Sequence, residues 1–360
     1  MKRRDFFKKA AGGALLAAGA TVAAPAIAAR RRFNWKLVTT WPPNLPIFQE
    51  GVERFASDIE KMSGRRLRIS VYAAGELIPA MQAFDAVSQG TVQMSHGAAY
   101  YWAGKVPAAQ FFTAVPFGMN AQGMNAWLYN GGGLALWRDV YKSYNLVPFP
   151  MGNTGVQMGG WFRKKINAIA DLKGLKMRIP GLGGKVMAKA GVNPILLAGG
   201  EIYTALERGT IDATEWVGPF HDQRLGLYRA AKYYYYPGWH EPGPVLELNV
   251  NSNAWAELPD EYRIMIETAA AAANAWMLAE FETKNLNALQ ELKQKHKVQV
   301  IEFPEAVITE LKRLTKITLD EEAAKDATFK QVYQAYRSFS ESNAAWNEIS
   351  EAAYAKTLKL

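Results

Sequence analysis

The spacing of apolar side chains predicts alternating strands and helices near the start of the mature sequence. Residues 35–41 alternate bulky apolar and polar side chains up to Pro42-Pro43, which predicts a strand followed by a loop. The next segment, 47–63, has apolar residues separated by steps of four, three, four and three, which predicts an amphipathic helix. Gly64 ends that helix, and the alternating segment 67–72 predicts a second strand.

Two later stretches read as copies of one unit. Residues 74–94 begin with Ala-Gly-Glu-Leu, continue through a short helical pattern and end in Gly-Thr-Val-Gln-Met. Residues 198–213 begin with Ala-Gly-Gly-Glu-Ile and end in Gly-Thr-Ile-Asp-Ala. Each copy follows a helix, a glycine and an apolar strand. The repeated order helix, strand, helix, strand predicts two α/β domains built from crossover units, whose ligands bind at the carboxyl ends of strands.

The C-terminal third is predicted to be helical. Residues 260–297 contain neither Pro nor Gly. As one helix they would span roughly 55 Å at about 1.5 Å per residue, enough to cross both domains. A further helix beginning at Phe329 has an apolar stripe that fits either core packing or a dimer contact, formed by Phe329, Val332, Tyr333, Tyr336 and Phe339.

The N-terminus has the pattern of an export signal. Lys2-Arg3-Arg4 precedes an apolar run from Ala10 to Ala24, and Ala26-Ile27-Ala28 supplies a cleavage site. This pattern is typical of a secretory signal, and the paired arginines are typical of the twin-arginine type. Removal of residues 1–28 would leave 37 basic and 32 acidic residues, a net charge of +5. The sequence has no basic run interleaved with aromatic residues, which is the pattern that would indicate nucleic-acid binding.

Several kinds of enzyme chemistry lack their residue patterns. The four histidines show no paired zinc-ligand spacing, and the sequence has no cysteine. Residues 180–186 have glycines and a lysine, but Val186 stands where a phosphate loop needs Ser or Thr. These absences favour a binding protein over an enzyme. A secreted lyase or hydrolase acting on carboxylates remains the alternative from a different functional class.

Three polar residues are candidates for binding a small anion with a cation. Arg178 ends the apolar strand 175–179, where its guanidinium could hold a carboxylate through two parallel hydrogen bonds. Glu215 follows another strand end and would repel an anionic ligand unless a cation lay between them. Gln157 offers a neutral carbonyl oxygen, which is the kind of ligand atom that hard cations take.

Aromatic side chains flank these candidates. Tyr100 and Tyr101 follow a predicted strand of the first domain, and Trp216 follows Glu215 in the second. Such residues form the walls of many ligand clefts, although core packing explains each of them equally well. Glu241, shortly after Trp239-His240, could line the same cleft.

Three segments carry a family resemblance: 171–181 (DLKGLKMRIPG), 201–216 (EIYTALERGTIDATEW) and 152–157 (GNTGVQ). Over residues 34–330 the chain resembles the substrate-binding proteins of TRAP transporters, with Gln157 and Glu215-Trp216 matching the branch for 2-oxo acids. The resemblance implies a periplasmic receptor binding a pyruvate-like acid with sodium or calcium and serving a membrane permease. It implies metal ligation by Gln157, Glu215 and Trp216, and dimers of some relatives through swapped C-terminal helices.

The expected fold class is therefore α/β, a two-domain periplasmic binding protein fold with a long domain-spanning helix and a helical C-terminal extension. The expected divisions are signal peptide 1–28, first lobe mainly 29–150, second lobe mainly 151–250, spanning helix and return 251–325, and extension 326–360. Receptors for lactate with calcium, for a dicarboxylate or for a sugar acid stay open. A larger ligand would need a second basic contact, for which Arg224 and Lys105 are candidates.

Export should depend on the paired arginines. Replacing Arg3 and Arg4 together by lysine keeps the charge but removes the pair that the twin-arginine machinery reads, so the variant should accumulate unprocessed inside the cell. Immunoblots of periplasmic and cytoplasmic fractions measure this. Normal periplasmic levels of the double variant would refute the twin-arginine route.

Overall fold

The computed structural model describes residues 31–358, and the export signal predicted for 1–28 lies outside these residues. By contacts the chain divides into the units Met1–Phe33 and Asn34–Leu360. Apart from Phe33, the first residue of β1, the helices and sheets described below belong to the second unit. No helix within 31–358 combines the length and apolar character needed to cross a membrane.

The second unit contains two sheets, each the centre of one lobe. The first has the strand order β2-β1-β3-β10-β4. Strands β1 and β3 are parallel, whereas β10 runs antiparallel to both of its neighbours. The bounds are β1 Phe33–Thr39, β2 Leu67–Tyr72, β3 Met94–Gly97, β4 Leu146–Asn153 and β10 Val245–Asn251. Strand β10 comes from the range expected mainly in the second lobe, yet it lies in the first sheet.

The second sheet has the order β11-β9-β5-β8-β6-β7. Its strands β8, β6 and β7 are parallel, and β5 runs antiparallel to β8 and β9. The bounds are β5 Gly160–Phe162, β6 Lys176–Arg178, β7 Asn193–Ile195, β8 Ala213–Thr214, β9 Tyr233–Tyr236 and β11 Gln299–Glu302. The parallel part of this sheet places the ends of β6 and β8 side by side.

The repeated unit predicted from the sequence is confirmed. In the first lobe the order is α2 (Phe48–Met62), β2, α3 (Ala83–Ser88) and β3. In the second lobe it is α6 (Gly181–Lys189), β7, α7 (Ile202–Glu207) and β8. Helix α2 buries the apolar face that its spacing predicted, including Val52, Phe55 and Ile59.

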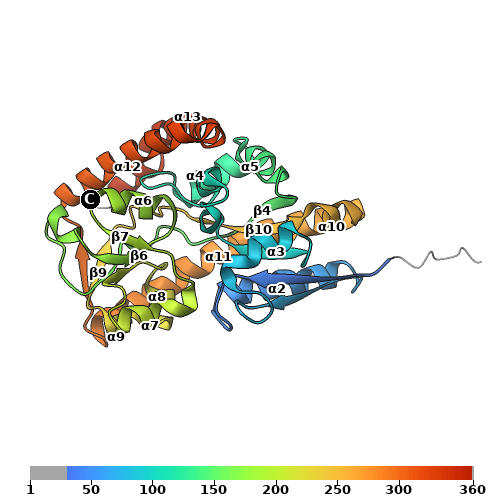
Figure 1. Cartoon of the computed structure of the whole chain (residues 1–360), viewed down its shortest axis with the longest axis horizontal. Coiled ribbons are helices and arrows are strands. Elements are labelled where there is room, and N and C mark those ends of the chain that lie inside the picture. Colours follow the sequence, from blue (N-terminus) through green and yellow to red (C-terminus); the bar gives the residue numbers. More distant parts are fainter. Residues whose placement is uncertain (1–30, 359–360) are drawn as a thin grey trace, which may run out of the picture. The chain divides into compact units, whose positions relative to one another are not determined.

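The predicted long helix is present as α11, which spans Asp260–Gln294 and has 35 residues. It packs against α2 and β4 of the first lobe and against α8 of the second (Figure 1). Phe281 on this helix contacts both Phe48 of α2 and His221 of α8. The helix therefore bridges the two lobes, as its length indicated.

The C-terminal stripe packs within its own chain. Helices α12 (Glu305–Lys325) and α13 (Ala327–Ile349) run along α6, α4 and α5 (Figure 1). Phe329 and Tyr336 are buried against Phe111, and the Tyr336 hydroxyl accepts the backbone N–H of Met119 at 2.9 Å. Of the two interpretations of this stripe, core packing is therefore correct and a dimer contact is wrong for its buried residues, because a face of the first lobe covers them.

Shorter elements complete the fold. The remaining α-helices are α4 (Ala121–Tyr129), α5 (Gly133–Lys142), α8 (Pro219–Arg224), α9 (Leu227–Ala230), α10 (Ser252–Glu257) and α14 (Glu351–Thr357). The 3-10 helices are η1 (Ala80–Gln82), η2 (Ala99–Trp102), η3 (Pro107–Phe112), η4 (Ile169–Leu172) and η5 (Gly199–Glu201). Among them, η2 follows β3 and α8 follows β8, so both begin near strand ends that face the other lobe.

A buried carboxyl group in β10 makes the stability of the fold depend on pH. Glu247 is completely buried and accepts hydrogen bonds from the Tyr141 hydroxyl at 2.9 Å and from the Trp102 indole. Burial raises the pKa of Glu247 to about 7, although both hydrogen bonds act in the opposite direction. The folded state thus holds the proton more tightly than the unfolded chain, and stability is lost as pH rises from about 4.5 to about 7.

Glu247→Gln should remove this pH dependence. Relative to the parent, the free energy of unfolding of the variant should rise by about 3 kcal/mol between pH 4.5 and pH 7.5, because only the parent must ionise a buried carboxyl group. Urea unfolding of both proteins at the two pH values measures the difference. A difference that stays constant with pH would contradict this account of Glu247.

Candidate functional site

The site is organised by Arg178, the last residue of β6. Its side chain is only 1% exposed and forms an ion pair with the carboxylate of Glu215. The guanidinium also donates to the backbone oxygen of Glu215 at 3.4 Å and to that of Leu197 at 3.3 Å. The Cζ atom of Arg178 lies 5.2 Å from the centre of the Trp216 ring, a distance typical of a cation–π interaction. Backbone and ring contacts together fix the direction of the guanidinium.

Glu215 supplies the negative charge of the pair. It follows β8 directly and is completely buried. Because β6 and β8 are parallel neighbours, their carboxyl ends bring Arg178 and Glu215 together. One carboxylate oxygen contacts Arg178, whereas the other has no hydrogen-bond partner within residues 31–358 and lies 3.5 Å from His240 Nε2.

The first lobe contributes the aromatic side of the site. Tyr100 and Tyr101 lie in η2, immediately after β3. The Tyr101 hydroxyl accepts a hydrogen bond from Arg178 Nη2 at 3.4 Å, and the Tyr100 hydroxyl donates to Glu241 Oε2 at 3.4 Å. Both contacts join the two lobes. Gly181, with a φ of +62°, packs against Tyr100. A Cβ atom at position 181 would lie 3.0 Å from the Cβ of Tyr100, so this close approach favours glycine.

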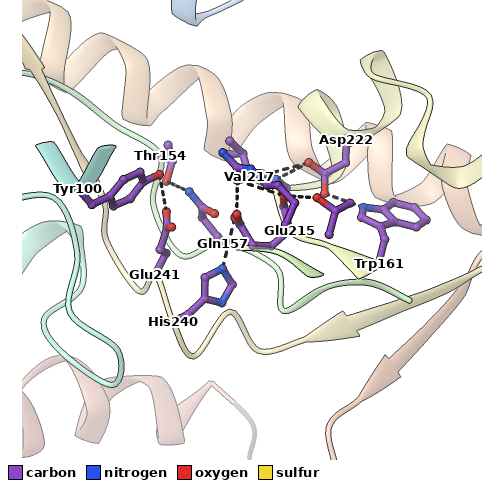
Figure 2. A network of polar contacts seen from close by, with 12 residues as sticks. Tyr100, Thr154, Gln157, Trp161, Glu215, Val217, Asp222, His240 and Glu241 are labelled. Carbon is purple, nitrogen blue, oxygen red and sulfur yellow. Dashed lines mark hydrogen bonds and ion pairs between the residues drawn. The ribbon is translucent and has the colours of Figure 1, made fainter. Parts of the chain in front are cut away.

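The loops after β4 and β9 add a second group of polar side chains. Gln157 is 4% exposed, and its amide nitrogen donates to Thr154 Oγ1 at 3.3 Å. Its backbone N–H donates to the carbonyl oxygen of Glu241 at 3.1 Å, which joins the two loops. Figure 2 shows Gln157, Glu215, His240 and Glu241 turned toward one another. Contacts therefore link the residues proposed to bind the ligand and the cation in one cluster: Arg178, Glu215, Gln157, Glu241, Tyr100, Tyr101 and Trp216.

The charges in this cluster are unbalanced. Burial raises the pKa of Glu241 well above its ordinary value, and the nearby charge of Glu215 raises it further. Burial alone would lower the pKa of Arg178, but the charge of Glu215, together with smaller effects of Tyr101, Tyr100 and Glu241, raises it above its ordinary value, so Arg178 stays protonated. Two buried carboxyl groups thus share one guanidinium. Burying a second unpaired negative charge is costly, so burial favours the protonated form of Glu241 and a nearby positive charge would favour the ionised form.

The donor atoms fit a hard cation. Gln157 Oε1 and one oxygen of Glu215 are buried and have no hydrogen-bond partner among the described residues. Ligand atoms of Glu215, His240 and Glu241 lie within 4.8 Å of one another. Sodium and calcium take oxygen ligands from carboxylates and carbonyl groups. Gln157, Glu215 and Glu241 could hold such an ion, whose charge would balance the second carboxylate.

His240 joins the cluster although its sequence context gave no metal-ligand pattern. The side chain is 2% exposed, and neither ring nitrogen has a hydrogen-bond partner among the described residues. The only signal in the sequence was its position next to Glu241. By contrast, Asp212 accepts the backbone N–H of Lys176 at 2.9 Å, a structural role.

The two further basic residues considered from the sequence are engaged elsewhere. Lys105 forms an ion pair with Asp85 on the surface of the first lobe. Arg224 is exposed, with its guanidinium over the ring of Phe220. Neither contact reaches the cluster around Arg178. Lys105 and Arg224 therefore do not supply a second basic side chain beside the Arg178 guanidinium.

Comparison with known proteins places this site in a family. The family model described as bacterial extracellular solute-binding protein, family 7, matches residues 37–326. The monocarboxylate 2-oxoacid-binding periplasmic protein of Nostoc sp. (strain PCC 7120) is 46% identical over 98% of this chain and 98% of its own length.

Solved structures agree with this assignment. A TRAP solute-binding protein from Colwellia psychrerythraea, crystallised with calcium and pyruvate, is 43% identical with a TM-score of 0.88, over 91% of this chain and 100% of that one. One from Bordetella bronchiseptica, a mixed-occupancy dimer with calcium and picolinate, is 38% identical with a TM-score of 0.89, over 91% and 97%. These relatives are solute receptors rather than enzymes. The chain belongs to family 7 of the bacterial extracellular solute-binding proteins, the periplasmic receptors of TRAP transporters.

Proposed function

We propose that this receptor binds a small 2-oxo monocarboxylate, such as pyruvate, together with a sodium or calcium ion. The observation that carries the proposal is the combination of one buried guanidinium with two buried oxygens that the described part of the chain leaves without a hydrogen-bond partner, Gln157 Oε1 and one oxygen of Glu215. The guanidinium suits a carboxylate, and the oxygens suit a hard cation. A 2-oxo acid presents both a carboxylate and a neighbouring carbonyl oxygen, so one ligand satisfies both groups.

In this proposal each residue has a distinct role. Arg178 pairs with the ligand carboxylate, using donors that now make long contacts of 3.4 Å with Tyr101 and with the backbone of Glu215. Gln157, Glu215 and Glu241 complete the cation's oxygen shell, together with the backbone carbonyl of Trp216. Tyr100, Tyr101 and the Trp216 ring form the walls. A bound cation makes the negative charge of Glu215 compatible with an anionic ligand.

The burial of the cluster favours a small ligand with one carboxylate. The side chains of Tyr100, Tyr101 and Trp216 are all less than 10% exposed, which leaves little room for a long substrate. A dicarboxylate or sugar acid would want a second basic contact, and neither Lys105 nor Arg224 provides it. Lactate differs from pyruvate by a hydroxyl in place of the carbonyl, so competition between these two acids is the informative comparison.

The relatives support the same ligand class. The Nostoc protein is named for monocarboxylate 2-oxo acids. Structures from Colwellia psychrerythraea and Pseudoalteromonas atlantica contain pyruvate with calcium and with sodium, respectively. For this chain we infer in addition export by the twin-arginine route and delivery of the ligand to TRAP permease subunits. We also infer the division into first lobe, second lobe, spanning helix and C-terminal extension.

Arg178→Ala should weaken pyruvate binding by more than about 100-fold. Removing the guanidinium leaves a buried carboxylate without its partner, which costs roughly 3–5 kcal/mol. Glu215→Gln should weaken binding through the cation, so added calcium should partly restore it. Calcium should not restore Arg178→Ala. Calorimetry with pyruvate, with and without calcium, distinguishes the two variants.

The parent protein is the reference for this experiment. Binding of pyruvate by the parent only in the presence of sodium or calcium is the expected result. An Arg178→Ala variant that binds as tightly as the parent would show that the carboxylate is held elsewhere. Preference for lactate over pyruvate in competition would favour the lactate alternative.

We also propose a homodimer, formed through the end of the C-terminal extension. The buried part of the α13 stripe is covered by the first lobe, but four large apolar residues beyond it are 62–72% exposed: Trp346, Ile349, Tyr354 and Leu358. Several exposed large apolar residues within one short segment favour a protein contact there. The Bordetella bronchiseptica relative, crystallised as a dimer, supports the proposal.

Trp346→Asp with Ile349→Asp should convert the dimer to monomers without unfolding the chain, because both side chains are exposed in the single chain. Sedimentation velocity at micromolar concentration measures the change. Leu286→Asp is the matched control, since Leu286 is 60% exposed on α11, away from the extension. A parent that sediments as a monomer at this concentration would end the dimer proposal.

A further inference from the structure

A buried carboxylate lies directly behind the proposed cation site without belonging to it. Asp222 in α8 is 1% exposed and accepts four hydrogen bonds (Figure 2). Its Oδ1 accepts the backbone N–H groups of Val217 at 3.1 Å and Gly218 at 3.2 Å. Its Oδ2 accepts the indole N–H of Trp161 at 2.9 Å and the hydroxyl of Tyr234 at 2.7 Å.

These bonds join a loop of the site to the centre of the second sheet. Trp161 and Tyr234 belong to the paired strands β5 and β9, and their rings stack with centroids 3.9 Å apart. Val217 and Gly218 follow Trp216 in the chain. One carboxylate oxygen therefore holds the loop, and the other is held by two stacked side chains of the sheet.

Burying the Asp222 carboxylate costs free energy, and half of the hydrogen bonds that offset this cost hold the loop after Trp216 in one position. Burial raises the pKa of Asp222 to about 6, against the opposing effect of the bonds from Tyr234, Trp161 and Val217. At neutral pH the group is ionised, so both oxygens act as acceptors. Among the described side chains Asp222 has no ion-pair partner. Four hydrogen-bond donors surround its carboxylate in place of a positive charge. Two of these donors are the backbone groups that follow Glu215-Trp216.

We propose that Asp222 is a positioning residue of the cation site. By fixing the backbone at Val217 and Gly218, it sets the direction of the Glu215 carboxylate and of the Trp216 carbonyl oxygen. This inference rests on the proposed function, in which both groups bind the cation. Partners that orient metal ligands from behind, without touching the ion, typically change metal affinity by about 10- to 100-fold when they are removed.

Asp222→Asn tests the proposal because an amide has only one acceptor oxygen. Whichever way the amide turns, its NH₂ group faces donors: either the two backbone N–H groups or the indole N–H of Trp161. With saturating pyruvate, the calcium concentration for half-saturation should rise at least about tenfold. In the cation-free protein, hydrogen exchange at the amides of Val217 and Gly218 should also become faster, a readout that needs neither ligand nor metal.

Three variants separate positioning from a general loss of stability. Trp161→Phe and Tyr234→Phe each remove one donor to Oδ2 but keep both bonds from the loop to Oδ1. Each should keep the calcium requirement within about threefold of the parent, whatever it does to the melting temperature. The double variant D222N/W161F should regain most of the calcium affinity, because the amide oxygen can face the loop while its NH₂ group donates to the Tyr234 oxygen.

The outcomes are distinct. Failure of the parent to bind calcium with pyruvate contradicts the proposed function and removes this inference with it. A parent that binds, beside a D222N variant with unchanged calcium affinity and amide exchange, overturns only the role of Asp222. If D222N does not fold, W161F and D222A/W161F form a second pair. D222A/W161F should then need a calcium concentration for half-saturation at least about tenfold higher than W161F does. Equal calcium concentrations for the two variants would overturn the proposal.

Discussion

The ion pair between Arg178 and Glu215 is the constraint on which the site depends. Both side chains are almost completely inaccessible to water, so each charge needs the other. In such surroundings the attraction is strong, but the cost of removing both charges from water is of similar size. Glu241 adds a second carboxyl group that the single guanidinium cannot neutralise. A cation placed between these carboxyl groups and an anionic ligand would offset the repulsion between them, which is why the two are proposed to bind as one unit.

The fold meets this constraint through the ends of its strands. Parallel pairing of β6 and β8 sets Arg178 and Glu215 side by side, and the crossover unit of the first lobe brings η2 against them. The long helix α11 contacts both lobes, so the two sets of residues are parts of one structure. Two walls of the proposed site, Tyr100 and Tyr101, come from the first lobe, whereas the charges and the Trp216 ring come from the second.

Much of this arrangement could be predicted from sequence because it depends on local pattern. The repeated helix–strand unit, the span of α11 and the position of Arg178 at a strand end all follow from spacing and punctuation along the chain. What could not be predicted depends on contacts between distant segments. The stripe at Phe329 and Tyr336 has the same spacing whether a partner or the first lobe covers it. Likewise, nothing local shows that β10 inserts into the first sheet.

The site was predictable to a similar degree. Gln157, Glu215 and Trp216 stand in recognisable segments, but His240 has no metal-ligand spacing, and Asp222 reads as an ordinary helix residue. Their roles come from loops that meet only in the folded chain. Asp222 acts through the backbone N–H groups of Val217 and Gly218. Almost every residue type has this group, so the sequence gives no sign of such a contact.

The most direct test of the central claim is the composition of the bound complex. Native mass spectrometry of the parent, exchanged into a volatile buffer with pyruvate and trace calcium, reports the mass of everything retained by each chain. Each chain should retain one pyruvate and one metal ion, which are gained and lost together as the calcium concentration changes. A complex that holds pyruvate without any metal ion would contradict the claim.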